Sequence, residues 1–125
     1  MKGNSVRSLK NLSGDRLLQV LSALANQHRL RILAVLTGER NYVSQIAREI
    51  GLSRPLIHMH LKQLEAAGLV SGSLELSDDG KAMKYYEVTP FALQLTPGVI
   101  AEAAQTLTGR PGASGTGETQ QETEK

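Results

Sequence analysis

One segment constrains the fold more than any other: residues 43–62, which read VSQIAREIGLSRPLIHMHLK. Ala47 is a small residue at the point where two helices would cross, and Gly51, four positions later, tolerates the backbone of a sharp turn. Apolar residues at helical spacing would hold the two helices at a fixed angle: Ile46, Ile50, Ile57 and Leu61. The segment therefore predicts a helix-turn-helix motif.

Alternating apolar residues directly after this segment predict a β-hairpin. From Leu69 the apolar period changes from helical spacing to alternation, and Asp79-Gly80 is a strong signal for a tight turn because glycine accepts a positive φ. We expect Tyr86 rather than Tyr85 to point inward. The first strand should then face apolar residues of the second, with Val70, Leu74 and Leu76 against Met83, a tyrosine and Val88.

Helical patterns flank this unit on both sides. Apolar residues recur at helical spacing in two helices over about residues 15–38, and a Pro-Gly pair at 97–98 opens a last helix. We expect Asp15, Ser44 and Ser53 to be N-caps, since their side chains can accept a hydrogen bond from a free backbone N–H. The order helix, helix, helix, helix, hairpin, helix predicts a mainly α fold with a small β-hairpin wing, a winged helix-turn-helix.

Composition divides the chain of 125 residues into one folded domain and two flanking segments. Residues 108–125 contain no Leu, Ile, Val, Met or aromatic residue. They are expected to form a disordered tail, because they cannot bury enough surface to offset chain entropy. Residues 1–13 are expected to form a mobile N-terminal arm, which leaves residues 14–107 as the folded domain.

Positive charge is concentrated around the helix-turn-helix. Residues 28–62 contain six Lys or Arg against two Glu, a net +4, whereas the whole chain carries +2. A basic segment of this kind suits a polyanion, and an aromatic content of 3% argues against a single-strand binder built on base stacking. The exposed side of the second motif helix and the hairpin would present basic and apolar side chains: Arg54, Pro55, His58, Met59, Lys62, Lys81 and Lys84.

These features predict double-stranded DNA as the partner, with the helix over residues 53–67 in the major groove. The hairpin over residues 77–84 would lie on the backbone or in the minor groove. The alternative is a winged-helix module for protein–protein contacts without DNA affinity, which Pro55, Leu56 and Met59 on the same face would serve. Salt-sensitive binding to duplex DNA would distinguish a DNA-binding protein from a protein–protein interaction module.

The chain lacks the residue patterns that metal sites and common enzyme active sites require. The chain has no cysteine, and His58 and His60 lie two apart on one helix, so they point away from each other and cannot share an ion. No spacing suggests a Ser-His-Asp triad, and no Gly-rich phosphate loop is present. We therefore expect no enzyme activity, no metal site and no cofactor. With neither a signal peptide nor an apolar run of spanning length, the expected location is the cytoplasm, with no membrane partner.

Three blocks of the sequence resemble the ArsR-type winged-helix transcriptional regulators: LANQHRLRIL at 24–33, VSQIAREIGLSRPLIHMHLKQLEAAGLV at 43–70 and KAMKYYEV at 81–88. The resemblance covers about residues 16–90. It implies a homodimer formed by the first and last helices, and in many members repression that an inducer relieves. It also implies phosphate contacts at Ser44 and Ser53 and base-facing positions at five residues: Arg54, Pro55, Leu56, His58 and Met59.

The sequence departs from this family at three places. Residues 41–45 lack the cysteines of its metal sensors, and residues 97–107 offer only Glu102 where others place Asp and His pairs. Pro55-Leu56 replaces a short polar pair, which favours van der Waals contact with thymine methyl groups. The sequence does not identify an effector.

The terminal helices carry more apolar side chains than a small winged core can cover. Left exposed, they would form a larger patch than monomers usually carry. We therefore expect a homodimer whose interface contains eight residues: Leu17, Leu18, Leu21, Leu24, Val99, Ile100, Ala103 and Leu107.

Overall fold

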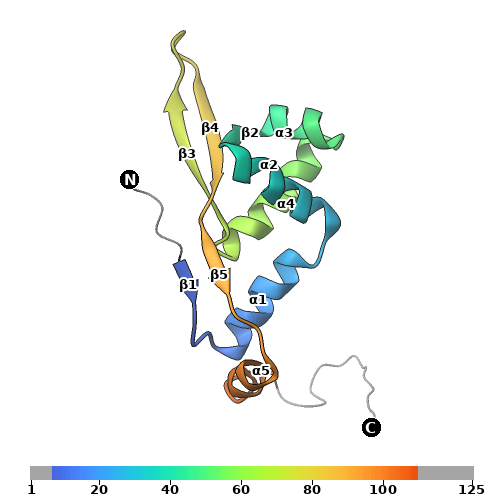
Figure 1. The fold of residues 1–125 in the computed structure, drawn as a ribbon. Helices are drawn as coiled ribbons and strands as arrows, with labels where there is room; N and C mark the ends of the chain where they lie inside the picture. The colour runs from blue at the N-terminus through green and yellow to red at the C-terminus, as the bar shows by residue number, and fades with distance from the viewer. Residues whose placement is uncertain (1–6, 110–125) are drawn as a thin grey trace.

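The computed structural model describes residues 7–109 (Figure 1). Its helices are Gly14–Leu24 (α1), Gln27–Gly38 (α2), Val43–Ile50 (α3), Arg54–Ala66 (α4) and Pro97–Ala104 (α5). Its strands are Arg7–Leu9 (β1), Asn41–Tyr42 (β2), Val70–Leu76 (β3), Ala82–Val88 (β4) and Phe91–Leu93 (β5). The predicted mainly α fold with a hairpin wing, a winged helix-turn-helix, is confirmed. Within these residues no helix is both long and apolar enough to cross a membrane.

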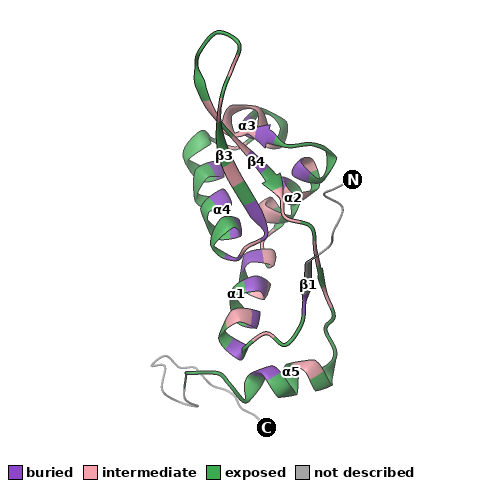
Figure 2. Ribbon diagram, turned by 90° about the vertical axis from the view of Figure 1, so that its left-hand side faces the viewer, coloured by how far each residue is buried: buried purple, intermediate pink, exposed green. Residues whose placement is uncertain are grey.

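The core lies where α1 to α4 pack against one another and against the base of the wing (Figure 2). Ile57 and Leu64 of α4 and Ile32 of α2 are completely inaccessible to solvent, as is Ile46 of α3. Ala47 is 9% exposed at the crossing of α3 and α4. These buried side chains hold α4 from its inner side and leave its outer side free.

The turn between α3 and α4 has the predicted geometry. Gly51 has φ 83°, in the left-handed region, and its N–H donates to the carbonyl oxygen of Ala47 at 2.8 Å. Ser53 is the N-cap of α4, and its Oγ accepts a hydrogen bond from the Leu56 N–H at 3.4 Å. The two helices of the motif are therefore joined by a short turn with a fixed backbone.

Two other predicted caps are wrong. Ser13 rather than Asp15 caps α1, because its Oγ accepts from the Arg16 N–H at 3.1 Å. Helix α3 begins at Val43, one residue before Ser44, because Tyr42 is still extended where β2 pairs with β4. No side chain caps α3.

The wing is the antiparallel hairpin β3–β4, with β2 paired on the other side of β4. Gly80, with φ 85°, closes a short loop in which its N–H donates to the Ser77 carbonyl at 2.9 Å. Tyr86 is 5% exposed and points inward, as predicted.

The expected apolar pairing at the tip of the wing is wrong. Leu74 pairs with Lys84 and Leu76 with Ala82, and the two leucines are 71% and 76% exposed. The hairpin extends beyond the helices (Figure 1), so no core remains for their side chains to enter.

The structure differs from the expected mobile arm over residues 1–13. Strand β1 pairs in parallel with β5, with Leu9 opposite Leu93, and Leu9 is 8% exposed. The apolar side chain of Leu9 therefore belongs to the core. Residues 1–6 of that arm and residues 110–125 of the expected disordered tail lie outside the described residues.

The residues that directly follow α5, as far as Thr108, are bound to the start of α1. The Gly14 N–H donates to Oγ1 of Thr106 at 2.7 Å. The Asp15 carboxylate accepts from both the hydroxyl and the N–H of Thr108, at 2.6 and 3.2 Å, and these bonds lower the pKa of Asp15. Thr108, the first residue of the expected tail, is thus attached to the folded domain.

Candidate nucleic-acid interface

The outer side of α4 presents the predicted recognition residues to solvent. Side chains three or four positions apart turn inward at Ile57, Leu61 and Leu64, and this fixes the orientation of the others. All six predicted residues of the helix are exposed: Arg54, Pro55, Leu56, His58, Met59 and Lys62. They form one surface in which two cations and a histidine alternate with apolar groups.

The two predicted phosphate contacts lie at different levels of exposure. Ser53 is exposed at the N-terminus of α4, where its Oγ accepts a hydrogen bond and its hydroxyl proton remains able to donate. Ser44 is half-buried in the first turn of α3. A phosphate oxygen beside α4 can therefore be reached by Ser53 and by the positive end of the helix dipole.

The two wing lysines have different surroundings. Lys81 is exposed at the tip, beside Asp78 and Asp79. The Lys84 Nζ lies 5.3 Å from the centroid of the Tyr86 ring, and its side chain crosses the space above Gly72. A Cβ on Gly72 would approach the Lys84 Cε to 2.6 Å, so this glycine makes room for the lysine. The positive charge of Lys84 is thus held on the inner face of the wing.

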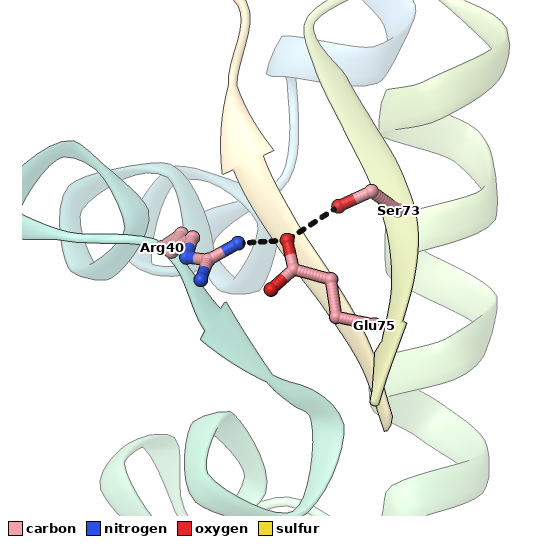
Figure 3. Close-up of polar contacts among 3 residues, drawn as sticks. All are labelled: Arg40, Ser73 and Glu75. Atoms are coloured by element: carbon pink, nitrogen blue, oxygen red, sulfur yellow. Dashed lines mark hydrogen bonds and ion pairs between the residues drawn. The ribbon is translucent and has the colours of Figure 1, made fainter. Parts of the chain in front are cut away.

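An ion pair that could not be predicted from the sequence joins β3 of the wing to the link between α2 and β2 (Figure 3). Arg40, just before β2, donates to the Glu75 carboxylate on β3, and the Ser73 hydroxyl donates to the same carboxylate at 3.4 Å. The Arg40 guanidinium also lies 4.5 Å from the centroid of the Tyr85 ring. The hydrogen bond from Arg40 lowers the pKa of Glu75, and the same bond raises the pKa of Arg40.

This ion pair changes the charge distribution inferred from the sequence. Arg40 belongs to the basic segment, but Glu75 neutralises it at close range. No sequence signal identifies the pair, because its members are 35 residues apart, with Arg40 in the link before β2 and Glu75 on β3.

The residues expected at a dimer interface divide into three groups. Leu17 and Ala103 are buried within the protomer, and three others are half-buried: Leu21, Leu24 and Val99. Three remain largely open to solvent, Leu18 at 57%, Ile100 at 46% and Leu107 at 40% exposed. Leu18 is on α1, Ile100 is on α5 and Leu107 follows α5. In Figure 1, α5 and the start of α1 lie at the opposite end of the molecule from the tip of the wing.

Metal-binding groups do not gather in the part of the chain that the structure covers. Across residues 7–109, no three His, Cys, Asp or Glu side chains lie close enough to hold an ion.

Comparison with known proteins identifies a family and individual proteins that are similar to this chain. Residues 26–71 match the family described as bacterial regulatory protein, arsR family. An uncharacterized HTH-type transcriptional regulator of Methanocaldococcus jannaschii is 33% identical over 78 residues, which span 62% of this chain and 81% of that protein. The nodulation protein NolR of Rhizobium meliloti is 45% identical over 51 residues, covering 41% of this chain and 42% of NolR.

Solved structures show the same fold. The homodimeric winged helix-turn-helix DNA-binding domain Mb0332 of Mycobacterium bovis, a possible ArsR-family regulator, is 27% identical with a TM-score of 0.54, covering 73% of this chain and 74% of that one. NolR of Sinorhizobium fredii is 28% identical with a TM-score of 0.51, covering 73% and 80%. The helix-turn-helix, the wing and these matches agree, and the chain belongs to the ArsR family of DNA-binding transcriptional regulators.

Proposed function

We propose that this protein is a homodimeric repressor that binds specific double-stranded DNA sequences in the cytoplasm. Helix α4 enters the major groove, and the wing over residues 77–84 lies on the backbone or in the minor groove. The observation that carries the proposal is the outer side of α4. Arg54, His58 and Lys62 point to solvent there, while buried residues of the same helix lock its orientation.

Base reading is assigned to the side chains that project farthest along this surface. A guanidinium at Arg54 can bind a guanine edge or a phosphate, and His58 lies one turn farther along the same side. Leu56 and Met59, 43% and 47% exposed, suit contact with thymine methyl groups. Lys62, Lys81 and Ser53 are assigned to phosphates, with Lys84 and Ser44 as further contacts beside the backbone.

Dimerisation is assigned to α1 and α5. Leu18 on α1, Ile100 on α5 and Leu107 just after α5 have exposed apolar side chains, and α5 is in contact with α1. A twofold axis there presents two α4 helices to DNA about one helical turn apart. The similar domain of Mycobacterium bovis is a homodimer, which supports the assignment.

A protein–protein interaction module is the second candidate. It is favoured by the exposed apolar surface of the wing, Leu74 and Leu76, and by the acidic pair Asp78 and Asp79 at its tip. This candidate requires no DNA affinity.

The two candidates are separated by DNA binding at two salt concentrations. Sequences bound by the protein are first selected from random duplex, and the affinity for the selected site and for random duplex is then measured at low and moderate salt. A repressor of the proposed kind prefers the selected site and loses affinity as salt rises. No selected sequence and no salt-dependent binding would contradict the proposal and leave the interaction module.

Single variants assign the roles. Arg54→Ala and His58→Ala are each expected to cost ~1–3 kcal/mol on the selected site and much less on random duplex. Lys81→Ala should weaken both kinds of DNA about equally and reduce the salt slope by about one counterion. Arg31→Ala is the matched control, because Arg31 is exposed on α2 and its guanidinium binds Gln27 of the same helix. Uniform losses for both α4 variants would refute base reading by these residues.

A further inference from the structure

Two arginines connect α1, the first of the proposed dimer helices, to α4, the recognition helix. The Arg16 Nη2 of α1 donates to the carbonyl oxygen of Ala67, at the end of α4, at 2.8 Å. Arg29 of α2 donates from Nε to the carbonyl oxygen of Ala23 at 2.7 Å and from Nη2 to that of Ser22 at 3.3 Å. Its Nη1 lies 3.2 Å from Nδ1 of His60, on α4.

The chemistry of these bonds is that of helix ends. The last carbonyl groups of a helix have no partner within it and carry a partial negative charge, so a guanidinium binds them well. Arg16 does this at the end of α4, and Arg29 does it at the end of α1. Because an arginine side chain only donates, Nδ1 of His60 accepts, and the ring carries its proton on Nε2.

The His60 contact lies inside the protein. His60 is 4% exposed, and the His28 ring lies 5.6 Å from the His60 ring, centroid to centroid. Burial, and next to it the positive charge of Arg29, lower the pKa of His60 and keep the ring neutral. The contact between Arg29 and His60 is therefore partly buried, with a half-buried arginine on one side and a buried histidine on the other.

The two connections lie at different points along both helices. Arg16 is near the start of α1 and reaches the end of α4, whereas Arg29 joins the end of α1 to His60 in the middle of α4. The buried side chains of α4 fix which side of the helix faces inward, and two hydrogen-bonded connections at different points along the helix fix its angle to α1. The position of α4 relative to α1 is thus determined twice.

We propose that Arg29 is a positioning residue for DNA recognition: together with Arg16, it fixes the angle between α1 and α4 and thereby sets the distance between the two DNA half-sites. Arg29 need not touch DNA. The inference rests on the proposed dimer, in which α1 belongs to the interface and α4 to the DNA. Adding one base pair between half-sites moves them apart by ~3.4 Å and rotates them by ~35°, which a rigid dimer does not tolerate.

The test measures affinity against half-site spacing. Duplexes carry two copies of the selected half-site with the spacing changed by one or two base pairs in either direction. The wild type and Arg31→Met are expected to lose about tenfold or more per base pair, on the scale of one mismatch. Arg29→Met should vary by less than about threefold over the same set, because α4 can pivot to follow the DNA.

A purely structural role of Arg29 predicts a different result. In that case Arg29→Met lowers the thermal stability and weakens DNA binding equally at all spacings, so the dependence of affinity on spacing has the same shape as in the wild type. Arg29→Lys provides a second variant if Arg29→Met folds poorly. Lysine keeps the positive charge but lacks the planar guanidinium that reaches three acceptors. The dependence of affinity on spacing in Arg29→Lys should therefore lie between those of the wild type and Arg29→Met.

The outcomes are distinct. A wild-type spacing profile in both Arg29 variants would overturn the inference and leave the dimer in place. Sedimentation of the wild-type protein before DNA is added tests the dimer itself. A monomer at tens of micromolar protein would overturn the proposed dimer, and the inference with it.

Discussion

Replacing Gly14 with alanine is expected to separate α5 from α1. A Cβ at this position would lie 2.4 Å from the carbonyl oxygen of Ala103 and 2.6 Å from Cγ of Leu107. Leu107 is exposed and can turn away, but the Ala103 oxygen belongs to the backbone and moves only with α5. Forced contacts of this kind cost ~1–3 kcal/mol, against about 0.5–1 kcal/mol gained by replacing a helical glycine. We expect a net loss of roughly 1–2 kcal/mol.

Thermal unfolding followed by circular dichroism, at equal protein concentration, measures this loss. The Tm should fall by about 4–8 °C for each kcal/mol. Gly38→Ala is the matched control, because a Cβ on Gly38, at the end of α2, meets no atom within 4 Å. Its Tm should be unchanged or slightly higher. If Gly14→Ala had the Tm of the wild type, the close approach of α5 to α1 would be refuted.

Three further predictions concern other parts of the molecule. Gly51→Ala adds a Cβ that meets no other atom, but at φ 83°, where L-residues are strained. The free energy of unfolding, measured in urea, should therefore fall by ~1–2 kcal/mol. An unchanged free energy would contradict the left-handed turn. Burial, followed by the charges of Arg29 and His28, lowers the pKa of His60 below 6.5 in the folded protein. Below pH 6.5 the unfolded chain therefore binds more protons than the folded one. The neutral His60 contributes its full stabilisation above pH 6.5, and this stabilisation is lost as the pH falls through the folded pKa. Unfolding between pH 7 and 5 should therefore be less pH-dependent in His60→Asn, and an equal slope would argue against a neutral His60. Glu75→Gln releases the charge of Arg40 and should raise affinity for random duplex at low salt, whereas unchanged affinity would show that Arg40 lies away from DNA.

The helix-turn-helix could be predicted because its determinants are local. Ala47, Gly51 and Ile57 lie within a few turns of one another, and each has one structural requirement that few residue types meet. The exposed side of α4 follows from the same periodicity, since burying Ile57 and Leu61 leaves Arg54 and His58 outside. Local pattern therefore predicted both the motif and most of the candidate DNA surface.

The remaining features depend on residues far apart in the sequence. Alternation predicted a strand at Leu74 and Leu76, but not that the hairpin extends past the helices and leaves both exposed. The Arg40–Glu75 pair joins two residues that are 35 positions apart. Two polar residues compete to cap α1, and Asp15 is engaged instead by Thr108 at the other end of the domain. None of these contacts leaves a periodic signal.

The pairing of β1 with β5 has a consequence for the order of folding. It joins Arg7 to Phe91, so the strand closes a loop that contains nearly all of the other described elements. Closing a loop of this length loses much chain entropy before any contact across it is formed. We therefore expect the local contacts of α2 to α4 to form first and the β1–β5 pairing to form late. Amide hydrogens of this ladder should then exchange with solvent faster than that of Ile57. During synthesis, β1 stays unpaired until Leu93 has left the ribosome, so the first described strand to be made is among the last to fold.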